Sequence, residues 1–350
     1  MARAYPSMVS MEHSERNYWT DECAVPDDGS MTSHDLTFAG VLTAAEIVSR
    51  ELSATPLQSH PLLDQALGRP VLVKHENVLP TGAFKVRGGV HLSARLTDAE
   101  RAHGVVTCST GNHAQSVAYG ARLAGVPATI VMPAGAPVAK RDAVRALGAE
   151  VVLAGGSLGE AAEHARARAR ESGASFICPT DPRIVLGHAT AYLELFTQAP
   201  DLDTLFVPVG SGTGAAGACL VRDALAPQCR IVGVQSSAAP AGWRSWRSGT
   251  IETAPATTRA AGLATTTGYP RTQAILRERL DDFVLVDDDA IDAAARLLAT
   301  CAHTLAEGAG AASLAGAVAT GVQGAVAVVC TGANASADEI ARLAGSVAAA

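Results

Sequence analysis

The chain has 350 residues, of which 48% are hydrophobic and 17% are charged, and its formal net charge is −7. This length and hydrophobic content suffice for a globular protein with a large core, which we expect to form two lobes. The negative charge and the lack of a basic block argue against a nucleic-acid-binding protein. Seven cysteines occur without a C-x-x-C pair or metal-ligand spacing, which indicates reduced thiols and a cytoplasmic protein.

The first 35 residues differ from the rest of the chain. They are mostly polar, contain four methionines and show no apolar periodicity. They have no apolar stretch of the kind found in signal peptides. We therefore expect residues 1–35 to form a disordered or loosely attached extension.

Short apolar segments alternate with helical segments through the remainder of the chain. This alternation predicts an α/β fold with parallel sheets covered by helices on both faces. We predict strands at residues 71–74, 105–108, 128–131, 150–153, 204–207, 231–234 and 325–330.

The stretch 308–337 carries no charged residue and is long enough for a membrane span. It is rich in Gly and Ala and is interrupted near Gly321. A buried helix at 309–320 followed by the last strand accounts for it better. We therefore predict no membrane segment.

Lys85 lies in residues 80–89 (PTGAFKVRGG), between Phe84 and Val86 and among small residues. Such a setting removes water from the ammonium and lowers its pKa, as a lysine that reacts with an aldehyde requires. This is the chemistry of a lysine that forms a Schiff base with pyridoxal phosphate. A lysine that extends into solvent from the start of a helix is the simpler alternative.

Residues 109–115 (STGNHAQ) form a polar turn between a predicted strand and an alanine-rich helix expected at 114–125. The N–H groups at a helix start lack helical partners and suit a carboxylate or phosphate. Asn112 adds an amide that could bond a ring hydroxyl. An ordinary turn with Ser109 or Thr110 as N-cap is the alternative interpretation.

A glycine-rich loop at residues 209–217 (VGSGTGAAG) directly follows the predicted strand 204–207. Its glycines let the backbone approach an anion, and the following helix directs its positive end toward that anion. Three of the glycines also satisfy G-x-G-x-x-G, but the next strand ends at Gln235 without a carboxylate that could hold a ribose. The loop therefore favours a single phosphate over a dinucleotide.

These three motifs and residues 330–334 (CTGAN) occur in the order and spacing of the threonine/serine dehydratases, and the chain resembles this family from about residue 36 to residue 344. The family belongs to the fold type II pyridoxal-phosphate enzymes, the tryptophan synthase β-like group. The resemblance implies two lobes with the active site in the cleft between them, and a homodimer. It places a small lobe at 96–185, inserted in a larger cofactor-binding lobe made of 36–95 and 186–350.

The resemblance also implies roles for individual residues. Lys85 would hold pyridoxal 5′-phosphate and then move the Cα proton, and Asn112 would bond the 3′ oxygen of the cofactor. Thr331 would face the pyridine nitrogen, which a hydroxyl cannot fully protonate. The other implied contacts are Phe84 beside the cofactor, Gly210, Ser211, Gly212, Thr213 and Gly214 around its phosphate, and Ser109, Thr110, Gly111, Asn112 and His113 around the substrate carboxylate.

Four positions depart from the pattern of the family. Gln235 stands where metal-binding members carry a glutamate, and no acid follows before Glu252, so we predict no metal site there. Residues 259–263 lack the usual alanine-aspartate-glycine. His188 stands where glutamine is typical; it either touches substrate or is structural. Thr110 takes the place of a catalytic serine of racemases, so it is a candidate acid/base.

The activity that the resemblance implies is β-elimination. A 3-hydroxy amino acid such as threonine or serine would be converted to a 2-oxo acid and ammonia, and this small-molecule substrate is the expected partner. A β-replacement synthase is an alternative, disfavoured because Val86, Arg87 and His113 replace its usual residues. An amino-acid racemase and a cofactor-binding protein without turnover are further alternatives.

Overall fold

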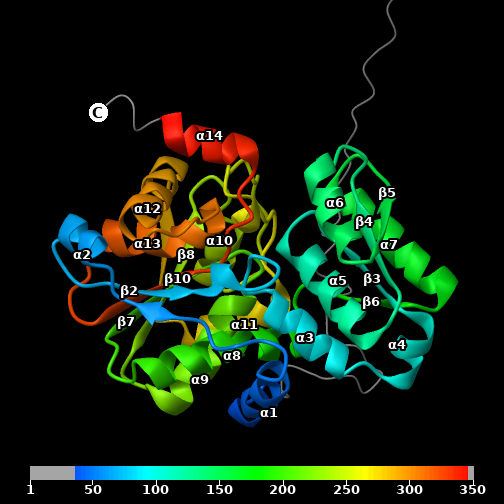
Figure 1. Ribbon diagram of the computed structural model, residues 1–350, viewed down its shortest axis with the longest axis horizontal. Coiled ribbons are helices and arrows are strands. Elements are labelled where there is room, and N and C mark those ends of the chain that lie inside the picture. Colours follow the sequence, from blue (N-terminus) through cyan, green and yellow to red (C-terminus); the bar gives the residue numbers. More distant parts are fainter. Residues whose placement is uncertain (1–35, 346–350) are drawn as a thin grey trace, which may run out of the picture.

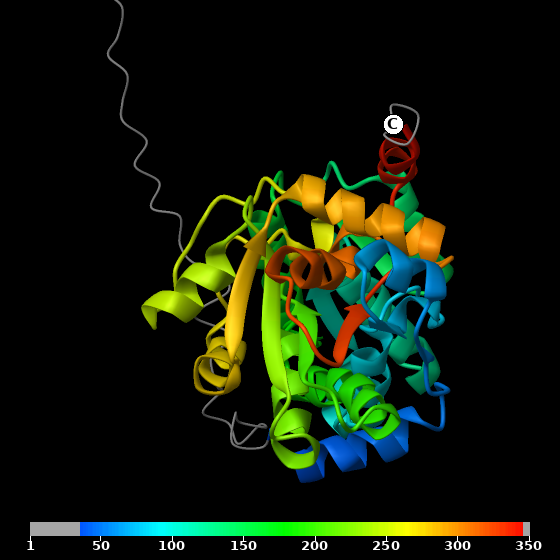
Figure 2. The same cartoon turned by 90° about the vertical axis from the view of Figure 1, so that its left-hand side faces the viewer.

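The computed structural model describes residues 36–345, and the expectation for residues 1–35 falls outside the described residues. The described chain contains two sheets flanked by helices (Figures 1 and 2). The strand pairs of both sheets are parallel, except that β1 is antiparallel to β2. The prediction of an α/β fold with helix-covered parallel sheets is confirmed.

The two sheets differ in size and come from different parts of the chain. The larger sheet has the order β1 (Leu57–Gln58), β2 (Leu72–His75), β10 (Val326–Cys330), β7 (Thr204–Pro208), β8 (Arg230–Ser236) and β9 (Asp282–Val286). The smaller sheet has the order β5 (Glu150–Leu153), β4 (Ala128–Met132), β3 (Val105–Cys108) and β6 (Ser175–Phe176).

Helices and two short 3₁₀ segments connect these strands. In chain order they are α1 (Phe38–Val48), α2 (Pro61–Leu67), η2 (Glu76–Val78), α3 (Val86–Ala94), α4 (Asp98–His103), α5 (Asn112–Ala124), α6 (Val138–Ala146), α7 (Leu158–Ser172), α8 (Pro182–Gln198), α9 (Thr213–Leu225), α10 (Ala241–Ser248), η3 (Ala261–Leu263), α11 (Pro270–Arg279), α12 (Asp288–Cys301), α13 (Gly308–Thr320) and α14 (Ala337–Gly345).

The alternation of side chains along the central strands builds one core on each face of the larger sheet. On β7, Leu205 and Val207 belong to the cluster with α1, α8 and α9, whereas Phe206 belongs to the cluster with α12 and α13. Neighbouring residues of a strand point to opposite faces. Both faces are therefore buried, which is why these strands are apolar throughout.

All seven predicted strands are present. Two of them, 105–108 and 150–153, have the predicted bounds, and the other five differ by one or two residues at an end. We did not predict β1, β6 or β9. β1 and β6 are only two residues long, which is too short for a periodic pattern. β9 is an edge strand that begins with Asp282 and is only partly buried.

The helix predicted at 309–320 is α13, which packs against the larger sheet and has no buried ionisable residue within it. Among residues 36–345, no helix has the length and apolar character needed to cross a membrane.

The cysteines only partly follow the expectation of reduced thiols. The structure has free thiols at Cys108, Cys219, Cys229, Cys301 and Cys330. Cys178 is disulfide-bonded, so the prediction is wrong at that residue.

Helix α3 joins the two sheets and packs directly on α5 through glycine. A Cβ atom on Gly89 would lie 2.0 Å from the carbonyl oxygen of Ser116, and one on Gly120 would lie 2.1 Å from that of Gly89. The two backbones therefore touch, which no larger residue would permit. This contact places the start of α3, with Lys85, beside the start of α5.

Candidate active site

Two adjoining cavities lie beside the ends of β3, β7 and β10, where the polar segments of the sequence follow the strands. Their volumes are about 300 Å³ and about 40 Å³. They share Lys85, Asn112, Ser211, Gly262 and Glu307 as lining residues. Because the carboxyl ends of parallel strands meet at one edge of a sheet, the segments that follow β7 and β10 converge here. The segment after β3 comes from the smaller sheet and is brought to them by the packing of α5 on α3.

The structure brings all thirteen predicted site residues to these two cavities. The larger cavity is lined by Lys85, Ser109, Thr110, Gly111, Asn112, His113 and Ser211. The smaller cavity is lined by Phe84, Lys85, Asn112, Gly210, Ser211, Gly212, Thr213, Gly214 and Thr331.

The glycine-rich loop forms a tight turn into α9. Gly212 has φ of +83°, the left-handed region that glycine adopts without strain. A Cβ atom on Gly210 would lie 2.4 Å from the carbonyl oxygen of Gly262. On the other side, Thr272 Oγ1 donates to the carbonyl oxygen of Ser211 at 2.7 Å. The loop is thus held so that the N–H groups at the start of α9 face the smaller cavity, a donor set that fits a phosphate.

Lys85 immediately precedes α3 and is half-buried, with its side chain between the two cavities. Burial lowers the pKa of Lys85 to about 8, while the carboxylate of Glu307 acts in the opposite direction. At pH 7 about a tenth of this lysine is therefore a free amine, far more than for an ordinary lysine with a pKa of about 10.4.

Asn112 is held on both sides by side chains from distant segments. Its Nδ2 donates to Glu307 Oε1 at 2.5 Å, and its Oδ1 accepts from Asn334 Nδ2 at 2.8 Å. Asn334 Nδ2 also lies 2.8 Å from the carbonyl oxygen of Thr81. Since Oδ1 and one Nδ2 hydrogen are engaged, the second Nδ2 hydrogen is the group that Asn112 can offer to a ligand.

Two histidines near the site face away from solvent. His113 Nε2 lies 3.0 Å from Thr107 Oγ1, and burial followed by the charge of Lys85 lowers the pKa of His113 to about 3. Its imidazole is therefore a neutral partner of Thr107 at the wall of the cavity. His188 lines neither cavity and lies behind the smaller one. This position favours the structural interpretation of His188 over contact with substrate.

Other lining residues were not predicted. The most notable are Glu307, Gly262, Lys140, Tyr269 and Asn334. Glu307 is buried, which raises its pKa to about 7, whereas the hydrogen bond from Asn112 acts to lower it. A single carboxylate directly before the uncharged stretch 308–337 was a signal in the sequence that could have identified it.

Gln235, where we predicted no metal site, is buried, and its Oε1 accepts from the backbone N–H of Trp243 at 2.9 Å. Within residues 36–345, no group of three or more His, Cys, Asp or Glu side chains is arranged to hold a metal ion.

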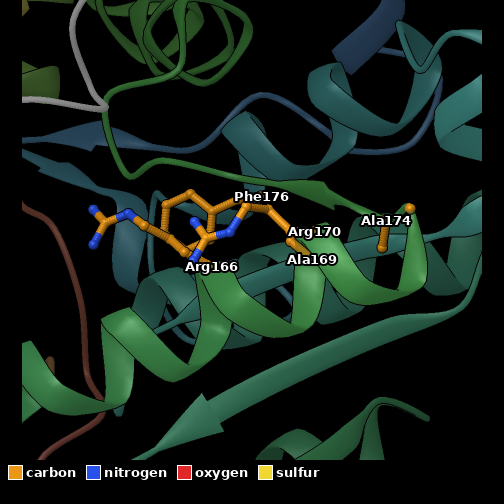
Figure 3. Close-up of a pocket in the computed structure, with 6 residues that line it drawn as sticks. Arg166, Ala169, Arg170, Ala174 and Phe176 are labelled. Carbon is orange, nitrogen blue, oxygen red and sulfur yellow. The ribbon is translucent and has the colours of Figure 1, made fainter.

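A separate hollow of about 370 Å³ lies between α7 and β6. In it the guanidinium of Arg166 lies over the ring of Phe176, 4.9 Å from the ring centre (Figure 3). None of the predicted site residues lines this hollow. We therefore assign the chemistry to the two adjoining cavities.

Comparison with known proteins agrees with this assignment. Residues 48–332 match the family described as pyridoxal-phosphate dependent enzyme. The chain is 35% identical over 284 residues to the L-threonine ammonia-lyase of Thermotoga maritima. The aligned segment covers 80% of this chain and 70% of that protein. It is 37% identical over 273 residues to the L-threo-3-hydroxyaspartate ammonia-lyase of Saccharomyces cerevisiae. That alignment covers 77% of this chain and 82% of the yeast protein.

A solved structure agrees in fold as well as in sequence. The T.th. threonine deaminase has a TM-score of 0.82 and 36% identity, with 86% of this chain and 99% of that chain covered. The family match, the relatives and the convergence of the predicted motifs lead to one conclusion. The chain belongs to the pyridoxal-phosphate dependent enzymes of fold type II.

Proposed function

We propose that this protein is an ammonia-lyase that uses pyridoxal 5′-phosphate to convert a 3-hydroxy amino acid, such as threonine or serine, to a 2-oxo acid and ammonia. The observation that carries the proposal is the convergence of Lys85, the glycine-rich loop and the start of α5 on two joined cavities. Relatives named as ammonia-lyases support the reaction class.

The residues of this chain fit the cofactor. The N–H groups from Ser211 to Gly214 would hold its phosphate, and Phe84 and Thr331 would line its ring. When bound, pyridoxal phosphate supplies the electron sink that stabilises the charge left at Cα. Lys85 Nζ would hold the cofactor and take the Cα proton, a role that its lowered pKa of about 8 suits.

The start of α5 is our proposed site for the substrate carboxylate. Ser109 to His113 line the larger cavity, and the first N–H groups of α5 are donors without helical partners. Asn112, fixed by Glu307 and Asn334, would donate its remaining hydrogen to the 3′ oxygen of the cofactor. Thr110 lines the same cavity and is our candidate for a second acid/base.

We further propose that residues 96–185, which carry the smaller sheet, form a small lobe, and that 36–95 with 186–350 form the large one. The active site would then lie between the lobes, where closure would exclude water. From the family resemblance we also propose a homodimer located in the cytoplasm.

The proposed reaction is tested by supplying the cofactor-loaded protein with threonine, serine and threo-3-hydroxyaspartate, each as the L and the D form. We expect stoichiometric release of a 2-oxo acid and ammonia from at least one of them. Loss of optical activity without release would indicate a racemase, and release only in the presence of an added thiol or amine nucleophile would indicate a replacement enzyme. A cofactor-loaded protein inactive in all three assays would contradict the proposal.

Replacement of Glu307 by glutamine should make Lys85 easier to deprotonate. Glutamine keeps an acceptor oxygen for Asn112 but removes the carboxylate charge that raises the pKa of Lys85. We expect the pH midpoint for capture of pyridoxal phosphate by the cofactor-free protein to fall by about half a pH unit. This shift corresponds to about 0.7 kcal/mol of lost interaction between the carboxylate and the ammonium of Lys85. A midpoint that stays unchanged or rises would contradict this coupling. Asp338→Asn is a useful control, because Asp338 also lines the larger cavity but is not among the charges that shift the pKa of Lys85 or of Glu307.

A further inference from the structure

His188 lies in α8, is only 1% exposed, and contacts three residues that line the smaller cavity without lining it itself. Its Nδ1 lies 3.0 Å from Thr213 Oγ1, and its Nε2 lies 3.3 Å from the carbonyl oxygen of Lys85. Its ring centre lies 4.5 Å from that of Phe84. The imidazole therefore spans the distance between the glycine-rich loop and the backbone of the proposed cofactor lysine.

The neighbouring backbone is adapted to this imidazole. A Cβ atom on Gly88 would lie 2.6 Å from His188 Nε2, so only glycine leaves room for the ring. The carbonyl of Lys85 also accepts from Ser116 Oγ and from the backbone N–H of Gly88. The peptide that follows the Lys85 side chain is thus held from several directions.

The chemistry of the partners determines the tautomer of His188. A carbonyl oxygen can only accept, so Nε2 must carry the hydrogen. Burial, followed by the charge of Lys85 and then those of His113 and Arg87, lowers the pKa of His188 and keeps the ring neutral. Nδ1 is then an acceptor, and the hydroxyl of Thr213 must donate to it.

We propose that His188 is a positioning residue that links the phosphate loop to the backbone of Lys85 through this donor–acceptor bridge. The bridge directs the Thr213 hydroxyl hydrogen away from the cavity, so the cofactor phosphate is bound by backbone N–H groups of the loop and α9. It also fixes the peptide from which the Lys85 side chain extends. The inference rests on pyridoxal phosphate occupying this cradle and does not depend on which amino acid is the substrate.

Glutamine is the informative replacement for His188. Its amide has one N–H donor for the Lys85 carbonyl and one oxygen acceptor for the Thr213 hydroxyl, so it can make both bonds. Leucine fills similar space but can make neither.

The test compares His188→Leu and His188→Gln by titrating each cofactor-free protein with pyridoxal phosphate. We expect the leucine variant to bind about tenfold more weakly, because the phosphate loop and the Lys85 peptide are then no longer held in the arrangement that receives the cofactor. The glutamine variant should bind within about threefold of the wild type. Wild-type affinity in the leucine variant, or equal weakening in both variants, would overturn the proposal. Binding needs no substrate, so failure of the proposed ammonia-lyase activity would leave this result interpretable.

A second measurement keeps the proposal testable if the leucine variant does not fold. Thr213→Val removes the other end of the bridge and should weaken pyridoxal phosphate binding to a similar extent. In the double variant with His188→Leu, the two losses of affinity should not add, because both variants break the same bridge. Full additivity would contradict the proposal.

The tautomer of His188 can be measured separately. Nitrogen-15 spectra of the wild type should show His188 with hydrogen on Nε2 only, and hydrogen on Nδ1 would overturn the assignment.

Discussion

Replacement of Lys85 by alanine is expected to abolish both the ammonia-lyase activity and the covalent capture of pyridoxal phosphate, while the unfolding midpoint stays close to that of the wild type. Lys85 lines both cavities and lies between the phosphate loop and the start of α5. The replacement removes the amine that lies where these segments converge, and this amine is the proposed nucleophile toward the cofactor aldehyde. Borohydride reduction followed by mass spectrometry of the labelled peptide measures the capture directly.

Lys140→Ala is the matched control, because Lys140 is another lysine that lines the larger cavity. It should still capture the cofactor at residue 85. A borohydride-reducible absorbance band that persists in Lys85→Ala, or disappears in Lys140→Ala, would show that the lysine has been assigned wrongly.

The same experiment has a defined pH dependence. The free amine is the reactive form, and burial lowers the pKa of Lys85 to about 8. Capture by the cofactor-free protein should therefore accelerate between about pH 7 and pH 9, where an ordinary lysine with a pKa of about 10.4 remains almost entirely protonated. A midpoint above pH 10 would mean that the ammonium of Lys85 is well solvated in the cofactor-free protein.

Local features of the site were predictable because each is encoded by consecutive residues. The glycine-rich loop follows β7 and the polar turn follows β3, and in both cases a strand leads into a helix whose first N–H groups are free to bind an anion. The resemblance to known dehydratases added roles to these segments. The parallel topology accounts for the meeting of the segments that follow β7 and β10, which belong to one sheet. That the segment after β3, from the other sheet, joins them was implied only by the resemblance to the dehydratases.

Contacts between distant residues were not predictable from the sequence. Glu307 is 195 positions from Asn112, and no local pattern shows that these two side chains meet. The same holds for His188. Its partners, Thr213 and the carbonyl of Lys85, depend on how α8 packs against α3 and α9. Side-chain partners of this kind are determined by tertiary packing. The hydrophobic periodicity of a segment does not indicate which distant side chains it will contact.

Arg87 is part of a buried ionic cluster that joins α3 to η2 and α8. Its guanidinium makes two bonds to Glu76, from Nε at 2.6 Å and Nη2 at 2.9 Å, and its Nη1 lies 2.6 Å from Glu194 Oε1. Lys74 Nζ adds a bond of 2.8 Å to Glu194 Oε2. The side chains of Arg87, Glu76 and Lys74 are fully buried, so these charges are stable only as a set.

Replacement of Arg87 by methionine is therefore expected to destabilise the protein by about 3–5 kcal/mol, because it leaves the carboxylate of Glu76 buried without its partner. Denaturant unfolding of the purified variant measures this free energy. Arg87→Lys should lie between the wild type and the methionine variant, since lysine retains the charge but not the forked geometry. Arg145→Ala, which breaks an exposed pair with Asp142, should change stability by no more than about 0.5 kcal/mol.

The double variant Arg87→Met, Glu76→Gln separates the loss of packing from the unpaired charge. If the buried carboxylate is the cause, removing its charge should restore part of the stability lost in Arg87→Met. If the double variant loses as much stability as the two single variants together, the loss arises from packing around α3 instead.

Since Lys85 immediately precedes α3 and His188 lies on α8, the cluster holds together the two helices that set the position of the proposed cofactor lysine. Arg87→Met should accordingly weaken pyridoxal phosphate binding as well as stability, whereas the exposed Arg145→Ala should alter neither.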